Sequence, residues 1–104
     1  MDELKIFSLN ARGLRNDKKR RELFHWLKRY HHGKQNFVML QETHSMQSDE
    51  NIWKSEWGGD IAFSHGSNNS RGVAILFPSN LDTIKVSNIK SDNEGRTLCI
   101  DIDN

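Results

Sequence analysis

The amino-acid sequence predicts an α/β fold, a mixed sheet with helices on its outer face. Leu4–Leu9 and Phe37–Leu40 are short, mostly apolar runs typical of buried strands. Residues 17–32 lie between them and place apolar side chains at three- and four-residue spacing among basic ones, which is the pattern of an amphipathic helix. The order strand, helix, strand predicts a crossover that makes the two strands parallel if they share a sheet.

The predicted helix over residues 17–32 has suitable residues at both ends. Asn16 or Asp17 can cap its start, and Gly33 suits its C-terminal stop. The positions expected to face the core are Leu23, Trp26 or Leu27, and Tyr30.

The remaining elements follow from shorter patterns. Ile52, Trp53 and Trp57 indicate a short helix over residues 49–57, stopped by the glycine pair 58–59. The apolar run 72–77, ended by the only proline, predicts a central strand. The other expected segments are a third strand over 60–64, a polar loop over 66–71, and two half-exposed strands over 84–86 and 98–102 joined by a turn at 92–95.

Length and composition limit the chain to one small domain. It has 104 residues, 35% of them hydrophobic, so two packed domains are excluded. Cys99 is the only cysteine, which excludes an internal disulfide framework or a four-cysteine zinc site and favours a reducing compartment, nuclear or cytoplasmic. No leader and no apolar run near 18 residues is visible, so we expect no membrane association.

The net charge of +1 hides an asymmetry along the chain. Residues 1–35 contain 10 Lys and Arg against 4 Asp and Glu, whereas residues 36–104 contain 5 against 10. The basic run Lys18–Arg21 on the predicted helix therefore has two interpretations: a grip on a nucleic-acid backbone, or an ordinary solvated helix face.

Polar residues follow both predicted parallel strands at the point where each one ends. Asn10 comes directly after the first strand, and Glu42 after the second. Such strand ends meet at one edge of an open α/β sheet, where these folds place ligand and catalytic groups. Glu42 suits a hard cation such as Mg²⁺, and the Asn10 amide could hold a phosphate or a metal-bound water. The alternatives are a solvated strand end for Glu42 and a turn residue for Asn10.

Four motifs, in order along the chain, carry a resemblance to a known family. They are SLNARGL at residues 8–14, LQETH at 40–44, RGVAIL at 71–76 and EGR at 94–96. Together they resemble the exonuclease-endonuclease-phosphatase family, with a particular likeness to the endonuclease domain at the N-terminus of LINE-type (non-LTR) retrotransposon proteins.

The resemblance implies a four-layer α/β sandwich of which residues 1–104 would form the N-terminal half. It implies a nicking endonuclease that hydrolyses a DNA phosphodiester with Mg²⁺, or Mn²⁺, where Glu42 matches the metal ligand and Asn10 the residue that arranges the phosphate and metal shell. The family also uses a tyrosine on a later strand, an Asp-x-Asn pair, and a C-terminal Asp and His. None of these has a match in the chain. We therefore expect weak metal binding and no turnover by residues 1–104 alone.

Other expectations concern the surface and the alternative functions. Arg12, His44 and Arg71 are candidate DNA contacts. The inner sheet face, with residues 37–40 and 73–77, is expected to lack a partner sheet and to drive self-association. The alternatives to an endonuclease are a non-catalytic nucleic-acid-binding fragment that uses the basic helix, and another phosphodiesterase or phosphatase branch of the same superfamily.

Overall fold

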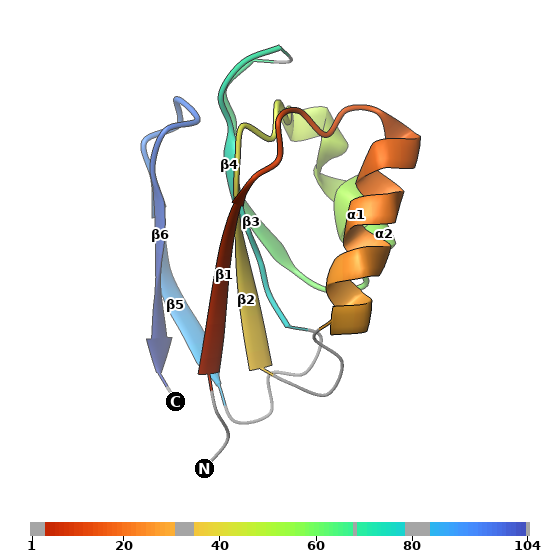
Figure 1. The fold of residues 1–104 in the computed structure, drawn as a ribbon. Coiled ribbons are helices and arrows are strands. Elements are labelled where there is room, and N and C mark those ends of the chain that lie inside the picture. The colour runs from red at the N-terminus through yellow and green to blue at the C-terminus, as the bar shows by residue number, and fades with distance from the viewer. Residues whose placement is uncertain (1–3, 31–34, 68, 79–83, 104) are drawn as a thin grey trace.

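The computed structural model describes residues 4–30, 35–67, 69–78 and 84–103 (Figure 1). Along the chain the elements are β1 (Leu4–Asn10), α1 (Asp17–Tyr30), β2 (Gln35–Gln41), a 3₁₀ turn (Gln47–Asp49), α2 (Glu50–Trp57), β3 (Ile61–Ser64), β4 (Val73–Leu76), β5 (Lys85–Ser91) and β6 (Leu98–Asp103). The expected helix stop at Gly33 falls outside the described residues.

The strands form two sheets. The larger has the order β1-β2-β4-β3, and β5 and β6 form a separate antiparallel hairpin. β1 and β2 are parallel, as the crossover predicts, whereas β4 is antiparallel to both of its neighbours, so the larger sheet is mixed. Figure 1 shows both helices on one side of this sheet and the hairpin on the other. The α/β class is therefore confirmed, and the described residues form three layers: helices, sheet and hairpin.

Helix α1 begins as expected, and of the two alternatives that the spacing allowed it turns Leu27, not Trp26, to the core. The Asn16 side chain caps the helix, because its Oδ1 accepts the backbone N–H of Lys19 at 2.9 Å. Leu27 is fully buried, and so is Phe24, whereas Trp26 is 46% exposed. The spacing left Trp26 and Leu27 as alternatives, and the structure selects Leu27. Within the described part of the chain, no helix is long and apolar enough to span a bilayer.

The basic run at the start of α1 is not one continuous solvated face. Arg20 is only 3% exposed and forms ion pairs with Glu56 at 2.6 Å and Asp17 at 2.7 Å. Its guanidinium also lies 5.2 Å from the centre of the Trp53 ring. Burial alone would lower the pKa of Arg20, but the hydrogen bonds to Glu56 and Asp17 outweigh it and the pKa is raised. Arg20 is therefore a structural residue that joins α1 to α2.

The side of the sheet that faces the helices is closed by aromatic side chains. Trp53 and Trp57 of α2 are 1% and 8% exposed, and the Trp57 indole donates to the Phe77 carbonyl at 2.8 Å. Phe24 meets Trp57 edge to face, with ring centres 5.7 Å apart. This packing confirms the short helix over 49–57, which ends at Gly58 in a left-handed conformation.

The opposite face of the sheet is covered only in part, which corrects the expectation of a bare face. The hairpin packs on Phe37, Ile75 and Phe77, which are 1%, 5% and 4% exposed. Toward the β1 edge the cover ends, so Ile6 is 60% exposed and Met39 36%. Cys99 occupies a strand position, as predicted, but on the exposed side of β6.

Candidate functional site

The candidate site lies where β1 and β2 end. In the parallel register Asn10 is paired with Gln41, so Glu42 is the next residue along the neighbouring strand. The two chains continue together beyond the strands. Backbone N–H groups of Ala11 and Gly13 donate to the carbonyls of Gln41 at 2.8 Å and Glu42 at 2.7 Å. The expected meeting of Asn10 and Glu42 at one sheet edge is thus present.

Asn10 fulfils the turn role that the sequence left open for it. Its Oδ1 accepts the backbone N–H of Arg12 at 2.9 Å, which closes a tight turn and fixes the direction of the amide. Arg12 itself has φ 52°, a left-handed conformation that the side-chain bond helps to hold. The amide remains exposed at the edge of the sheet, so the turn role and a role in ligand binding are compatible.

Glu42 presents an exposed carboxylate at the same edge. Within the described part of the chain, its carboxylate makes no ion pair with a Lys, Arg or His side chain. Its backbone has φ 52°, and that of His44 has φ 56°, conformations uncommon for residues with a side chain. Two such residues in one turn, next to an unneutralised carboxylate, are typical of a functional site that the surrounding structure holds in place.

The turn from Glu42 to Ser45 is fastened to the start of β4. Backbone N–H groups of Thr43 and His44 donate to the carbonyls of Gly72 at 3.0 Å and Arg71 at 2.9 Å. Gly72 has φ 97°, and a Cβ atom there would overlap the Thr43 hydroxyl, so only glycine fits. The RGVAIL and LQETH motifs are therefore in direct contact.

The three predicted DNA contacts are brought to this end of the molecule. Arg12 and Arg71 are exposed, and the imidazole of the half-buried His44 lies directly over Gly13. Arg71 shares a backbone hydrogen bond with His44. The ends of β1 and β2, the β3–β4 loop and the β5–β6 turn gather at the same end in Figure 1.

The β5–β6 turn is docked on the same rim through main-chain atoms. The Gly95 carbonyl accepts the Gly72 N–H at 3.0 Å, and the Gly95 N–H donates to the Ser64 hydroxyl at 3.1 Å. Gly95 is buried between exposed neighbours, and a Cβ atom there would meet the backbone of Gly66 and Gly72. This contact places the EGR motif beside the other three.

Asp92 organises that turn. The backbone N–H of Glu94 donates to its carboxylate at 3.1 Å, and the Ser64 hydroxyl does so at 2.9 Å. The Glu94 hydrogen bond, followed by those from Ser64, Thr97 and Arg96, lowers the pKa of Asp92 well below the ordinary value of 3.8. The hydrogen bonds of the turn therefore favour the ionised carboxylate.

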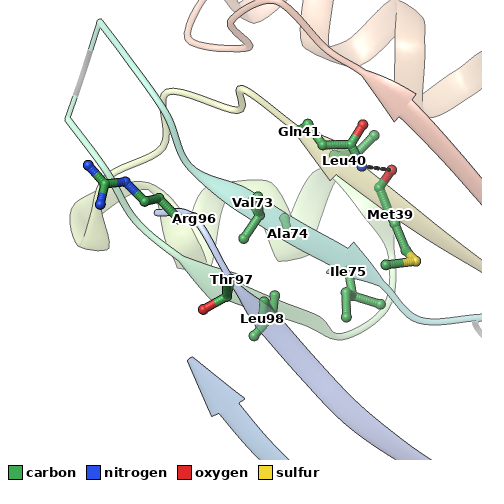
Figure 2. Close-up of a pocket in the computed structure, with 9 residues that line it drawn as sticks. All are labelled: Met39, Leu40, Gln41, Val73, Ala74, Ile75, Arg96, Thr97 and Leu98. Atoms are coloured by element: carbon green, nitrogen blue, oxygen red, sulfur yellow. Dashed lines mark hydrogen bonds between the residues drawn. The ribbon is translucent and has the colours of Figure 1, made fainter. Parts of the chain in front are cut away.

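A cavity of about 290 Å³ lies between the sheet and the start of β6. Figure 2 shows Met39 at one end of it and Arg96 extending at the other. Its lining consists of Met39, Leu40, Gln41, Val73, Ala74, Ile75, Arg96, Thr97 and Leu98. Neither Asn10 nor Glu42 belongs to the lining, so the cavity is not the centre of the candidate chemistry.

The residues at the edge fit part of a metal site. Carboxylate and amide oxygens suit Mg²⁺, which keeps several waters and binds few protein ligands. Glu42 and Asn10 supply one group of each kind. Among the described residues, no three of His, Cys, Asp and Glu are grouped so as to hold a metal ion. Asn10 and Glu42 therefore suit a hard cation, but they provide only two protein ligands for it.

A comparison with models of protein families shows which family the chain is related to. The model of the Endonuclease/Exonuclease/phosphatase family matches residues 6–102, nearly the whole chain. The chain belongs to this family. Membership places it in a superfamily of nuclease- and phosphodiesterase-type hydrolases that are generally metal-dependent. The match spans all four motifs in which the sequence resembles the Endonuclease/Exonuclease/phosphatase family.

Sequence reasoning missed several polar residues behind the Glu42 turn. Thr43 and Ser45 are completely buried, and the Ser45 hydroxyl contacts His65, which in turn contacts Glu50. The five histidines lack a metal-ligand spacing, which favours surface or loop positions for them. His65 does lie in the loop after β3, but it is bonded on both ring nitrogens, which the sequence did not indicate. The available signal was weak: a Thr-x-Ser pair directly after Glu42, and a histidine directly after β3.

Proposed function

We propose that the chain carries part of the active site of a metal-dependent endonuclease that nicks DNA, in the manner of LINE-type retrotransposon endonucleases. The parallel register of β1 and β2 carries this proposal, because it brings Asn10 and the unneutralised Glu42 to one edge of the sheet. Family membership supports hydrolysis of a phosphate ester. The likeness of the four motifs to LINE-type endonucleases supports DNA as the substrate.

Each residue of the edge has a distinct role in this proposal. Glu42 binds Mg²⁺, or Mn²⁺, and Asn10 directs its amide toward the phosphate and the metal-bound water. The bound cation supplies charge stabilisation to the phosphodiester as negative charge develops on it. Arg12, His44 and Arg71 contact neighbouring phosphates of the DNA backbone and set its direction across the edge.

The proposal includes weak binding and no measurable turnover for residues 1–104 by themselves. One carboxylate and one amide make a poor cage for a cation that dehydrates reluctantly. The described residues also contain no group of three His, Cys, Asp or Glu side chains that could complete such a cage. Hydrolysis then requires groups supplied by further chain or by a partner.

Titration with Mn²⁺, followed by NMR, tests the metal site without needing turnover. Paramagnetic broadening should be centred on Asn10, Glu42 and Thr43, and Glu42→Gln should abolish it because the amide carries no charge. Glu22→Gln on the exposed face of α1 is the matched control and should leave the broadening unchanged. Broadening that is spread over all acidic residues, or that survives Glu42→Gln, would contradict the proposal.

The basic face of α1 supports a second candidate function, binding of nucleic acid without catalysis. Lys18, Lys19 and Arg21 are exposed, although Arg20 is withdrawn into the core. DNA binding that falls steeply with salt, is weakened by Lys18→Ala with Arg21→Ala, and is unaffected by Glu42→Ala would favour this function. Metal-dependent nicking of a supercoiled plasmid by the chain together with the further chain or partner that supplies the remaining groups, abolished by Glu42→Ala, would favour the endonuclease. Cleavage of a lipid phosphodiester in preference to DNA would indicate another branch of the superfamily.

A further inference from the structure

A continuous line of hydrogen bonds runs behind the Glu42 turn. The Thr43 and Ser45 hydroxyls are 2.9 Å apart, and the Ser45 hydroxyl lies 2.8 Å from Nδ1 of His65. Nε2 of His65 then meets the Glu50 carboxylate at 2.7 Å. The line joins three separate parts of the fold: the turn after β2, the loop directly after β3 and the start of α2.

The contacts give the hydrogen-bond directions at both ends of this line. The Glu50 carboxylate accepts from Nε2–H of His65, because a carboxylate oxygen accepts and the ring N–H donates. The Thr43 oxygen accepts the Ser45 backbone N–H at 3.3 Å. Between these ends the Ser45 hydroxyl, which can both donate and accept, is bonded to Nδ1 of His65 and to the Thr43 hydroxyl.

The arrangement of Ser45, His65 and Glu50 is not that of a catalytic nucleophile. Ser45 is completely buried, and its hydroxyl is engaged by both Thr43 and His65. A nucleophile must reach a substrate, and this hydroxyl has no access to one. The His65 ring is also stacked on Phe63, with ring centres 4.9 Å apart, which limits its movement.

The line of hydrogen bonds ends at Thr43, in the turn that carries Glu42. Thr43 lies between Glu42 and His44, both of which have left-handed backbone conformations. Such conformations persist only where the surroundings hold them. The buried Thr43 hydroxyl is anchored through Ser45 to His65, and its backbone N–H is bonded to Gly72. Both the side chain and the backbone of Thr43 are thus held in place.

We propose that His65 is a positioning residue: through Ser45 and Thr43 it holds the left-handed turn that presents the Glu42 carboxylate at the sheet edge. Glu50 holds the imidazole in place through its other ring nitrogen, Nε2. The consequence for cation binding rests on the proposed function, whereas the effect on the turn does not. Neither His65 nor Glu50 touches the cation or the substrate in this role.

Amide hydrogen exchange tests the effect on the turn. His65→Phe keeps a ring on Phe63 but removes both hydrogen bonds, so the Thr43 and His44 amides should exchange about tenfold faster. His65→Asn, whose side-chain amide can replace Nδ1 opposite Ser45, should restore much of the protection. The Phe77 amide, bonded to Asp60 at the far end of β4, is the internal reference and should not change. His25→Phe on exposed α1 is the matched control variant.

The outcomes separate this proposal from the proposed function. Unchanged exchange at Thr43 and His44 in His65→Phe, or equal acceleration of all amides, would overturn it. Should His65→Phe fail to fold, Glu50→Ala cuts the same line at its half-buried end and should accelerate the same two amides. In the Mn²⁺ titration, His65→Phe should weaken broadening at Glu42 several-fold. A wild-type chain without any Mn²⁺ response would refute the metal site, while the exchange result would still decide the role of His65.

Discussion

The two faces of the four-stranded sheet are covered to different extents. The face beneath α1 and α2 is sealed by Trp53, Trp57 and Phe24, all of them buried. The face beneath the β5–β6 hairpin is sealed over β3 and β4 but opens toward β1, where Ile6 and Met39 are exposed. Two helices therefore close one face of this sheet, whereas a single hairpin is too narrow to cover the other face as far as β1. Stability should therefore depend mainly on the helix face, and association on the hairpin face.

Removing the largest buried side chain of the helix face should have the greatest effect. Trp53→Ala should lower the free energy of unfolding by about 4 kcal/mol, a large share of the stability of a small domain. Urea denaturation followed by circular dichroism measures the loss. Trp26→Ala, at a tryptophan that is 46% exposed, should cost less than about 1 kcal/mol. Similar losses for both tryptophans would contradict the contrast between buried and exposed positions.

Loss of the ion pair that joins the two helices should have the second-largest effect on the free energy of unfolding. Arg20→Ala should cost about 3 kcal/mol, because it leaves the largely buried Glu56 without its partner and uncovers Trp53. The neighbouring Arg21→Ala, at an exposed position, should change stability by less than about 0.5 kcal/mol. The same denaturation experiment compares them. Equal effects would mean that the basic run acts as one solvated surface.

The turn between β5 and β6 should contribute less to the free energy of unfolding than the ion pair does, and its contribution should depend on pH. The pKa of Asp92 is lower in the folded chain than its ordinary value of 3.8, so its stabilising effect is complete above about pH 5 and is lost as the pH falls below 3.8. Asp92→Asn should therefore be less stable than wild type at pH 7, and the difference should shrink toward pH 2. Asp103→Asn, at an exposed strand end, is the control. A difference in stability between Asp92→Asn and wild type that does not change with pH would refute the stabilising role of the ionised Asp92 carboxylate.

The open part of the hairpin face should affect association more than folding. Ile6→Lys should leave the free energy of unfolding within about 1 kcal/mol of wild type, because the side chain is 60% exposed. We expect it to shift the chain toward the monomer in sedimentation velocity, because exposed apolar patches favour association. Ile52→Lys, at a similarly exposed position on α2, should not. A chain that is monomeric as wild type would contradict this prediction.

Much of the fold could be predicted from local patterns. The apolar runs and the crossover helix predict parallel β1 and β2, and with them the meeting of Asn10 and Glu42. The choice between Trp26 and Leu27 could not be made, because both positions suit the spacing and only packing against α2 and the sheet decides. The partial cover of the sheet was also missed, because the reach of the hairpin over Phe37 and Ile75 depends on tertiary geometry.

The polar support of the site lay beyond sequence reasoning. Ser45, His65 and Glu50 belong to three different segments, and no spacing rule brings a residue after β3 next to one at the start of α2. The buried Arg20 was hidden in the same way, because a run of four basic residues reads as surface until Glu56 is placed beside it. In both cases the informative contact is between elements, and the sequence encodes it only through the complete fold.

The burial of Gly95 has a consequence for how the site could diversify. The hairpin tip touches the rim through the peptide groups of Gly95, which bond to the Gly72 N–H and the Ser64 hydroxyl, so its spacing from the strands does not depend on the side chains of Glu94 and Arg96. Those two residues, on either side of Gly95, are exposed. Substitution of either one should therefore change the chemistry of the tip without moving the Gly95 contact beneath it.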